Sequence, residues 1–254
     1  MSMKALYTGV GKEDIGKYVI FSGDPWRVER LCKYMDSPKK IAFLREFNTY
    51  TGMYKGIKVT ITSTGIGAPS AAIAMEEMYE AGMEVAVRMG TVMSLKENTL
   101  GDFMIPVAAM RREGTSQSYV DLSYPAVADI ELINIMNDTV KSVDKKYHNG
   151  INCTMDGFYT NMHESRFSKE SNRDIDKTFN ELRKLGVDGI DMESACLMTL
   201  GRLMNVKTCT LTIVTVLEDL KDKLEGEERK EAEELLCRVA LEGIYNYANK
   251  KETV

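Results

Sequence analysis

Short apolar runs rich in β-branched residues alternate along the chain with longer segments in which apolar positions recur at helical spacing. This alternation is expected of an α/β protein in which helices cover both faces of a sheet. The predicted strands span residues 18–22, 59–63, 85–88, 102–108 and 208–216. The predicted helices span residues 25–35, 69–81, 129–143, 194–204 and 227–246.

The chain length and the unbroken pattern favour one domain. With 254 residues, of which 44% are hydrophobic, the chain can bury a full core. No internal repeat, low-complexity block or linker rich in proline and serine divides it, so we expect residues 1–254 to form a single domain. The charged run 218–234 has Lys and Glu at helical spacing, which favours a solvated helix with an approach loop over a lid.

Charge and cysteine content exclude several classes of protein. The formal net charge of −5 and the scattering of Lys and Arg among Asp and Glu argue against nucleic acid as a partner. The cysteines are odd in number, widely spaced and without metal-binding spacing, which indicates reduced core thiols: Cys32, Cys153, Cys196, Cys209 and Cys237. No apolar run reaches the length of a signal peptide near the N-terminus, or the roughly 18 residues of a membrane span elsewhere. We therefore expect a cytoplasmic protein that binds no membrane.

Candidate chemistry begins with glycine-containing segments that follow three successive predicted strands. Gly23 and Arg27 follow the first strand, the loop 63–70 follows the second, and Arg88 with Gly90 ends the third. Because ligands bind beyond the carboxyl ends of strands in open α/β sheets, we expect the three segments to converge on one crevice. Arg27 and Arg88 stay charged and can bind phosphate through forked hydrogen bonds. For either arginine alone, a surface salt bridge would be the simpler interpretation.

Segment 189–195 carries two carboxylates at the start of a predicted helix. A carboxylate there can accept hydrogen bonds from two adjacent sugar hydroxyls and favour a ribosyl cation nearby, although Asp191 or Glu193 could equally cap the helix. The motifs of P-loop ATPases, zinc proteases and esterases are missing, and His148 and His163 are the only histidines. Cleavage of an N-glycosidic bond by phosphate needs neither a metal nor a covalent nucleophile.

These segments resemble the hexameric uridine phosphorylases. The matching segments occur in the same order from about Leu6 to the C-terminal helix: Gly23-Asp24-Pro25 with Arg27, Arg45-Glu46-Phe47, and residues 63–67, 88–91, 125–129 and 192–195. The resemblance implies an α/β fold, namely a three-layer αβα sandwich with a central mixed β-sheet. It also implies a homodimer as the active unit within a homohexamer, with inorganic phosphate as co-substrate and no required cofactor.

The resemblance also implies how phosphate and ribose are held. In the family, phosphate is bound by the residues that match Gly23, Arg27, Arg88 and Thr91. The residue that matches Arg45 reaches phosphate across a dimer interface. Ribose is bound by the residues that match Thr91, Met192 and Glu193. Tyr7 matches the histidine that reaches the 5′ hydroxyl from the neighbouring subunit. In some members a monovalent cation lies between subunits near positions that match Glu46, Ile66 and Ser70.

The chain departs from the family pattern at the base. The base stacks near the residue that matches Phe158, but Met162 and Glu164 stand where uridine phosphorylases read the uracil edge with a glutamine and an arginine. A local shift would let another polar residue take over, with three candidates: Asn161, His163 and Arg166. Met162 could equally mean a looser apolar pocket.

Purine-specific relatives protonate the leaving base with an aspartate after the last core strand. Leu217 falls at or beside that position, and Glu218 could donate the proton if the loop moves by one residue. Because the flanking sequence is closest to the uridine phosphorylases, the favoured function is phosphate-dependent cleavage of uridine or a related pyrimidine nucleoside, with Arg88, Glu193 and Glu218 as catalytic residues. A purine nucleoside phosphorylase is the alternative, followed by a protein that binds nucleoside or phosphate without turnover. A nucleosidase, which uses water in place of phosphate, would have no use for Arg27, Arg45 and Arg88 together.

Overall fold

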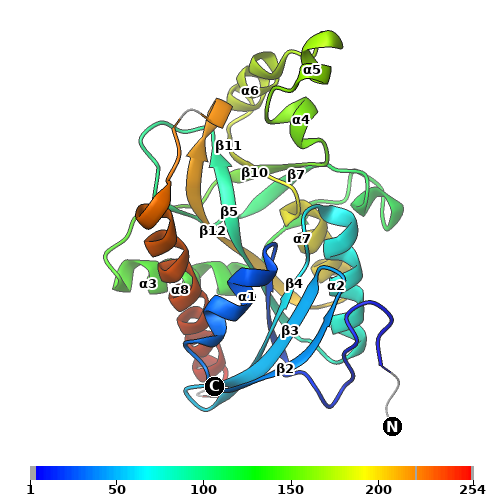
Figure 1. Ribbon diagram of the computed structural model, residues 1–254, viewed down its shortest axis with the longest axis vertical. Helices are drawn as coiled ribbons and strands as arrows, with labels where there is room; N and C mark the ends of the chain where they lie inside the picture. Colours follow the sequence, from blue (N-terminus) through cyan, green and yellow to red (C-terminus); the bar gives the residue numbers. More distant parts are fainter. Residues whose placement is uncertain (1–3, 221, 253–254) are drawn as a thin grey trace.

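The computed structural model describes residues 4–220 and 222–252 (Figure 1). Its strands are β1 (Tyr18–Ser22), β2 (Asp36–Leu44), β3 (Phe47–Tyr54), β4 (Ile57–Ser63), β5 (Val85–Ser94), β6 (Phe103–Met104), β7 (Ala108–Arg112), β8 (Ala126–Val127), β9 (Tyr147–His148), β10 (Ile151–Met155), β11 (Val187–Asp191) and β12 (Lys207–Leu217). Its helices are α1 (Pro25–Cys32), α2 (Ala68–Glu80), α3 (Ile130–Ser142), α4 (Phe158–Asn161), α5 (Arg166–Glu170), α6 (Ile175–Lys184), α7 (Ser194–Leu203) and α8 (Gly226–Glu252). Two short 3-10 turns span Ser116–Ser118 and Glu218–Leu220.

The strands of the described residues form one mixed sheet. Its main path runs β2-β3-β4-β1-β5-β11-β10-β7-β8, and β12 pairs with both β5 and β6. The neighbours β4, β1, β5 and β12 are parallel to one another. The antiparallel pairs are β2 with β3, β3 with β4, and β11 with β5. The carboxyl ends of the parallel strands therefore lie at one edge of the sheet, which is where an α/β fold binds ligands.

Helices cover both faces of this sheet. Tyr18 and Ile20 of β1 contribute to one buried cluster with residues of α1, α3 and α8. Val19 and Phe21 contribute to a second cluster with residues of α2 and α7 on the other face (Figure 1). Because both faces of β1 are buried, its sequence is a continuous apolar run without alternation. The α/β fold, a three-layer αβα sandwich with a central mixed sheet, is confirmed.

Two predicted strand boundaries are wrong. The predicted strand 85–88 continues as β5 to Ser94, because β12 pairs with it along its whole length. Gly90 therefore lies within a strand and not in a loop after one. The predicted strand 102–108 is divided into β6 and β7. Pro106 lies between them and has no backbone N–H to donate to a neighbouring strand.

The five cysteines are free and buried, as predicted. Burial raises the pKa of the Cys32 thiol to about 12 and has the same effect on Cys153. These thiols are protonated at neutral pH and pack as small apolar side chains. None of the helices within residues 4–220 and 222–252 is both long enough and apolar enough to span a membrane.

Candidate active site

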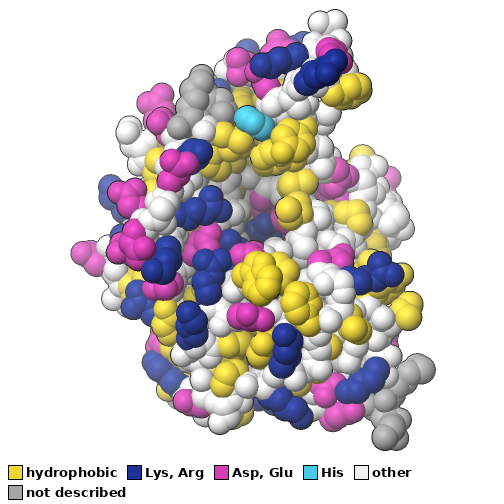
Figure 2. All heavy atoms as spheres, viewed as in Figure 1, with side chains coloured by type: hydrophobic (Ala, Val, Ile, Leu, Met, Phe, Trp, Pro, Cys, Tyr) yellow, Lys and Arg dark blue, Asp and Glu magenta, His cyan; other side chains and the backbone are white. Residues whose placement is uncertain are grey.

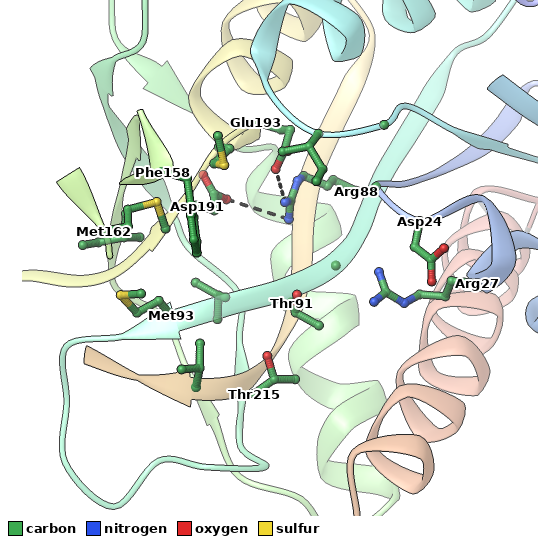
Figure 3. A pocket seen from close by; sticks show the side chains of 18 of the residues that line it. Asp24, Arg27, Arg88, Thr91, Met93, Phe158, Met162, Asp191, Glu193 and Thr215 are labelled. Carbon is green, nitrogen blue, oxygen red and sulfur yellow. Dashed lines mark hydrogen bonds and ion pairs between the residues drawn. The ribbon is translucent and has the colours of Figure 1, made fainter. Parts of the chain in front are cut away.

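A cavity of about 690 Å³ opens at the carboxyl ends of β1, β4 and β5. It is visible as the hollow near the middle of the face shown in Figure 2. Its lining divides into two ends, which Figure 3 shows in close-up. Asp24 and Arg27 lie at one end, Phe158 and Met162 lie at the other, and Glu193 lies between them (Figure 3). A ligand that fills this cavity meets charged groups at one end and apolar groups at the other.

Strand register brings the predicted segments together. Ser22 of β1 is level with Ser63 of β4 and Met89 of β5. The loop after β4 is fixed to the end of β1, because the backbone N–H of Thr64 donates to the carbonyl of Ser22 at 2.7 Å. Gly67 adopts a φ of 98°, which glycine tolerates, and precedes the first turn of α2. The predicted convergence of these segments on one crevice is therefore confirmed.

The cap of α1 fixes the direction of Arg27. Asp24 accepts a hydrogen bond from the backbone N–H of Trp26 at 2.9 Å, and Pro25 occupies the first turn. Arg27 follows in that same turn, is 5% exposed and lines the cavity. Its Nη2 lies 3.2 Å from Oε1 of Glu233, while its Nε is buried and has no hydrogen-bond partner within the described chain. One edge of the guanidinium is thus anchored, and Nε remains available.

The carboxylate of Glu233 in α8 forms ion pairs with three arginines, which was not predicted from the sequence. Its carboxylate lies 2.8 Å from Nη2 of Arg30 and 3.1 Å from Nε of Arg229, in addition to its contact with Arg27. Burial favours the neutral acid, but Arg27 and Arg30 outweigh it and lower the pKa of Glu233 below its ordinary value of 4.5. The ionised carboxylate therefore stabilises the folded state.

We expect Glu233→Gln to destabilise the fold by about 3 kcal/mol at neutral pH, because three guanidinium groups lose their shared buried carboxylate. A carboxyl group with a lowered folded-state pKa stabilises the fold above its unfolded pKa and loses that contribution as pH falls through the folded value. The difference from the wild type should therefore shrink below a pH of about 4.5. Urea unfolding at two pH values measures it, with the exposed Glu231→Gln on the same helix as control. If both variants lost the same free energy of unfolding at neutral pH, the stabilising role of Glu233 would be contradicted.

Arg88 and two carboxylates form the buried centre of the site. Nη2 of Arg88 contacts Oε2 of Glu193, and Nη1 lies 3.8 Å from Oδ2 of Asp191 (Figure 3). Burial disfavours the charged guanidinium, but Glu193 and Asp191 outweigh burial and raise the pKa of Arg88. A Cβ on Gly90 would come within 2.6 Å of Nη1 of Arg88, so glycine at this position makes room for the guanidinium.

The two carboxylates of segment 189–195 have different partners. Asp191 contacts the first turn of α7, because its Oδ1 accepts a hydrogen bond from the backbone N–H of Ser194 at 3.2 Å. Thr154 donates to the same oxygen at 2.8 Å. Glu193 forms no such capping bond within the described residues, and its Oε1 instead accepts from the backbone N–H of Gly67 at 2.7 Å. Glu193 therefore occupies the N-cap position of α7 without a side-chain capping bond, whereas Asp191 stabilises the first turn of the helix. Both carboxylates line the cavity.

The far end of the cavity is apolar. Phe158 packs edge-on against Tyr159, with ring centroids 5.0 Å apart, which fixes the orientation of its ring. The residues of this end are Val92, Met93, Phe158, Met162, Ile190, Val216 and Leu220. Five of these residues were not among the candidates: Val92, Met93, Ile190, Val216 and Leu220. The first two were missed because β5 was predicted too short, and Leu220 because the approach to α8 was interpreted as a solvated loop.

Several candidate residues lie outside the cavity of their own chain. Tyr7 and Arg45 lie together, with the guanidinium carbon 5.4 Å from the ring centroid. Arg45 occupies the tip of the β2–β3 hairpin with a φ of 54°, which is strained for a residue with a Cβ. Glu218 pairs with Arg183. Glu164 lies 3.0 Å from Lys169 on the surface.

The residues that match the cation site of the family gather at the mouth of the cavity. Glu46 and Ile66 line it, and the hydroxyl of Ser70 donates to the carbonyl of Gly67 at 3.4 Å. Of the alternative base-reading residues, His163 lines a neighbouring cavity, with its ring centroid 6.0 Å from that of Phe158. Arg166 is exposed and pairs with Glu170 at 2.8 Å.

Known proteins share the fold and much of the sequence of this chain. The family model of the phosphorylase superfamily matches residues 17–244. The chain is 37% identical to a uridine phosphorylase from Thermococcus kodakarensis over 195 residues, which is 76% of this chain and 70% of that protein. Its structure is similar to that of a uridine phosphorylase from Vibrio fischeri, with a TM-score of 0.84, 30% identity and coverage of 95% and 96% of the two chains. A purine nucleoside phosphorylase from Toxoplasma gondii in complex with immucillin-H gives a TM-score of 0.85, 26% identity and coverage of 98% and 99%. The chain belongs to the phosphorylase superfamily.

Proposed function

We propose that this protein is a nucleoside phosphorylase, with uridine as the favoured substrate. The observation that carries the proposal is the two-ended cavity, in which Arg27 and Arg88 lie on the charged side and Phe158 lies on the apolar side. Its volume of about 690 Å³ is in the range of small-molecule sites and exceeds what phosphate alone requires. The uridine phosphorylases among its relatives support the choice of base.

Phosphate would be held by groups that converge on the charged end: Gly23, Arg27, Arg88 and Thr91. Met192 and Glu193 would hold the ribose, because the Glu193 carboxylate can accept hydrogen bonds from both sugar hydroxyls. A phosphate oxygen forms the new bond to C1′, and the electron pair of the broken C1′–N bond leaves with the base. The products are the free base, after it takes up a proton, and ribose 1-phosphate. Glu193 favours the positive charge that develops on the sugar.

The active unit would be a homodimer, and the homohexamer is the proposed assembly. Within one chain, Arg88 pairs with Glu193, and Arg27 shares the carboxylate of Glu233 with Arg30 and Arg229. A further cation would help to balance the charge of a phosphate dianion. Arg45 has no such carboxylate partner among the described residues, and with Tyr7 it would enter the cavity of the second copy. Exposed apolar side chains next in sequence to Tyr7, Arg27, Arg45 and Gly67 would suit such an interface: Leu6, Trp26, Leu44 and Ile66.

A monovalent cation would fit at the same interface. Glu46, Ile66 and Ser70 offer a carboxylate, a backbone carbonyl and a hydroxyl, which are the oxygen donors that hard cations prefer. The proposed cation is structural, and no step of the reaction passes through it.

A purine nucleoside phosphorylase is the second candidate. The purine enzyme from Toxoplasma gondii is as similar in structure as the uridine phosphorylase from Vibrio fischeri. Glu218, two residues before the cavity-lining Leu220, would then protonate the leaving base, which requires release from Arg183.

We expect phosphate-dependent release of free base from uridine in a panel that also contains thymidine, inosine and adenosine, each with a phosphate-free control. Cleavage of purine nucleosides alone would favour the second candidate. Release of base without phosphate would indicate a nucleosidase, because water would then take the place of phosphate in the reaction. Binding of nucleoside or phosphate without release of any base would contradict an enzymatic role.

A further inference from the structure

The carboxylate of Glu233 lies behind the charged end of the cavity. It contacts Nη2 of Arg27, which lines the cavity, but Glu233 itself is not part of the lining. Glu233 is 4% exposed and Arg27 is 5% exposed, so bulk water does not compete for their contact. Among the described residues, Glu233 is the hydrogen-bond partner of this guanidinium, and the buried Nε of Arg27 has none. A ligand at this end of the cavity therefore meets Arg27, and Glu233 holds Arg27 from behind.

Glu233 fixes Arg27 without neutralising it. The same carboxylate lies 2.8 Å from Nη2 of Arg30 and 3.1 Å from Nε of Arg229, so three guanidinium groups share one negative charge. Asp24, whose Oδ2 lies 3.0 Å from Nη2 of Arg30, adds a second carboxylate to the cluster. Three cations and two carboxylates leave a net positive charge beside this end of the cavity, and such a charge attracts an anion.

The contact between Arg27 and Glu233 also joins two helices. Arg27 lies in the first turn of α1, whereas Glu233 lies in α8, 206 positions later in the sequence. Arginine has a long, flexible side chain, and a guanidinium that is already held in place loses little freedom when it binds an anion. A displacement of a binding group by about 1 Å can slow a reaction by about a hundredfold. A carboxylate outside the cavity lining can therefore control how well Arg27 meets a ligand.

We propose that Glu233 is a positioning residue for phosphate, which acts by holding Arg27 in the orientation that binds the anion. This inference rests on the proposed function. The direction of the effect separates this role from a purely electrostatic one. If Glu233 acted only through its charge, its removal would make the site more positive and would strengthen the binding of phosphate. If Glu233 holds Arg27 in place, its removal weakens the binding of phosphate.

The test measures the affinity of the full-length protein for inorganic phosphate, in the wild type and in Glu233→Gln. Steady-state kinetics at saturating uridine gives KM for phosphate. Thermal unfolding at rising phosphate concentration gives its Kd without turnover, with sodium chloride at matched ionic strength as the reference for screening. We expect Glu233→Gln to raise both constants by about tenfold or more, whereas KM for uridine should stay close to its wild-type value. Glu233→Asp keeps the charge but draws the carboxylate away from Arg27, so it should also weaken phosphate binding, and it serves if Glu233→Gln does not fold.

Glu242→Gln is the matched control. Glu242 lies in the same helix, accepts hydrogen bonds from Tyr54 and Lys55 at 2.7 Å, and does not line the cavity. Its substitution also removes a paired carboxylate from α8, but phosphate affinity should not change. An unchanged or higher phosphate affinity in a folded Glu233→Gln or Glu233→Asp variant would overturn the proposal.

The positioning role and the proposed function fail in different ways. If the wild type cleaves no nucleoside but binds phosphate more tightly than Glu233→Gln does, the proposed function fails and the positioning role stands. If the wild type cleaves uridine and both Glu233 variants bind phosphate as it does, the positioning role fails and the proposed function stands. Absence of phosphate binding to the wild type would overturn both.

Discussion

Arg88→Ala should lower kcat/KM for phosphate-dependent cleavage by about a hundred- to a thousandfold, the usual cost of removing one oriented charge contact. Arg88 is the guanidinium at the centre of the cavity, and Glu193, its partner, is proposed to steady the sugar. The substitution removes the proposed phosphate contact and also leaves Glu193 without its counter-ion. Steady-state kinetics at saturating nucleoside, with phosphate varied, separates the loss in kcat from the rise in KM for phosphate.

Folding must be monitored in parallel, because buried Glu193 and Asp191 lose their cation in this variant. Arg88→Lys keeps the positive charge beside both carboxylates but loses the forked geometry, so it should fold and still bind phosphate poorly. Arg166→Ala, at a side chain that is 91% exposed, is the surface control. Near-normal activity in a folded Arg88→Ala enzyme would show that the assigned phosphate site is wrong.

Mixing two inactive variants should restore activity if Arg45 acts on the neighbouring copy. Arg45→Ala and Arg88→Ala are each expected to be nearly inactive. In a mixed dimer one site carries both defects, whereas the other carries neither. Random exchange makes half of the dimers mixed, and each has one intact site of two, so about a quarter of the wild-type activity should return.

The control for this experiment is a mixture of Arg88→Ala with Glu193→Ala. Both residues line the cavity of their own chain, so each site of a mixed dimer keeps one defect and no activity should return. Differently tagged chains establish that subunits have exchanged. If exchange is complete and the Arg45→Ala mixture stays inactive, Arg45 does not serve the neighbouring site.

Local sequence patterns predicted the elements at the centre of the fold. The five residues of β1 are all buried, and their continuous apolar run marks a central parallel strand. The glycines and the arginines after β1 and in β5 also marked the charged end of the cavity. Each of these signals lies within a few residues of sequence, which is the range over which propensity and periodicity act.

The remaining features depend on contacts between distant segments. β5 continues past Gly90 because β12, more than a hundred residues later, pairs with it. Glu233 pairs with Arg27, which is 206 positions away in the sequence. In a helix rich in glutamates, the sequence alone does not show which of them will be buried against an arginine. The apolar end of the cavity likewise requires Met93 and Leu220 to meet, and no local pattern joins them.

The continuity of β5 gives the site a fixed length. Arg88 and Met93 are five residues apart on one strand, which at about 3.3 Å per residue corresponds to about 16 Å of backbone. Under the proposed function, this stretch of β5 is thus a ruler along which the sugar and the base would lie. An insertion of one residue between them would lengthen the ruler by about 3.3 Å and turn each later side chain to the opposite face. Under the proposed function, this segment can therefore exchange side chains over time, whereas its length would be set by the size of the ligand.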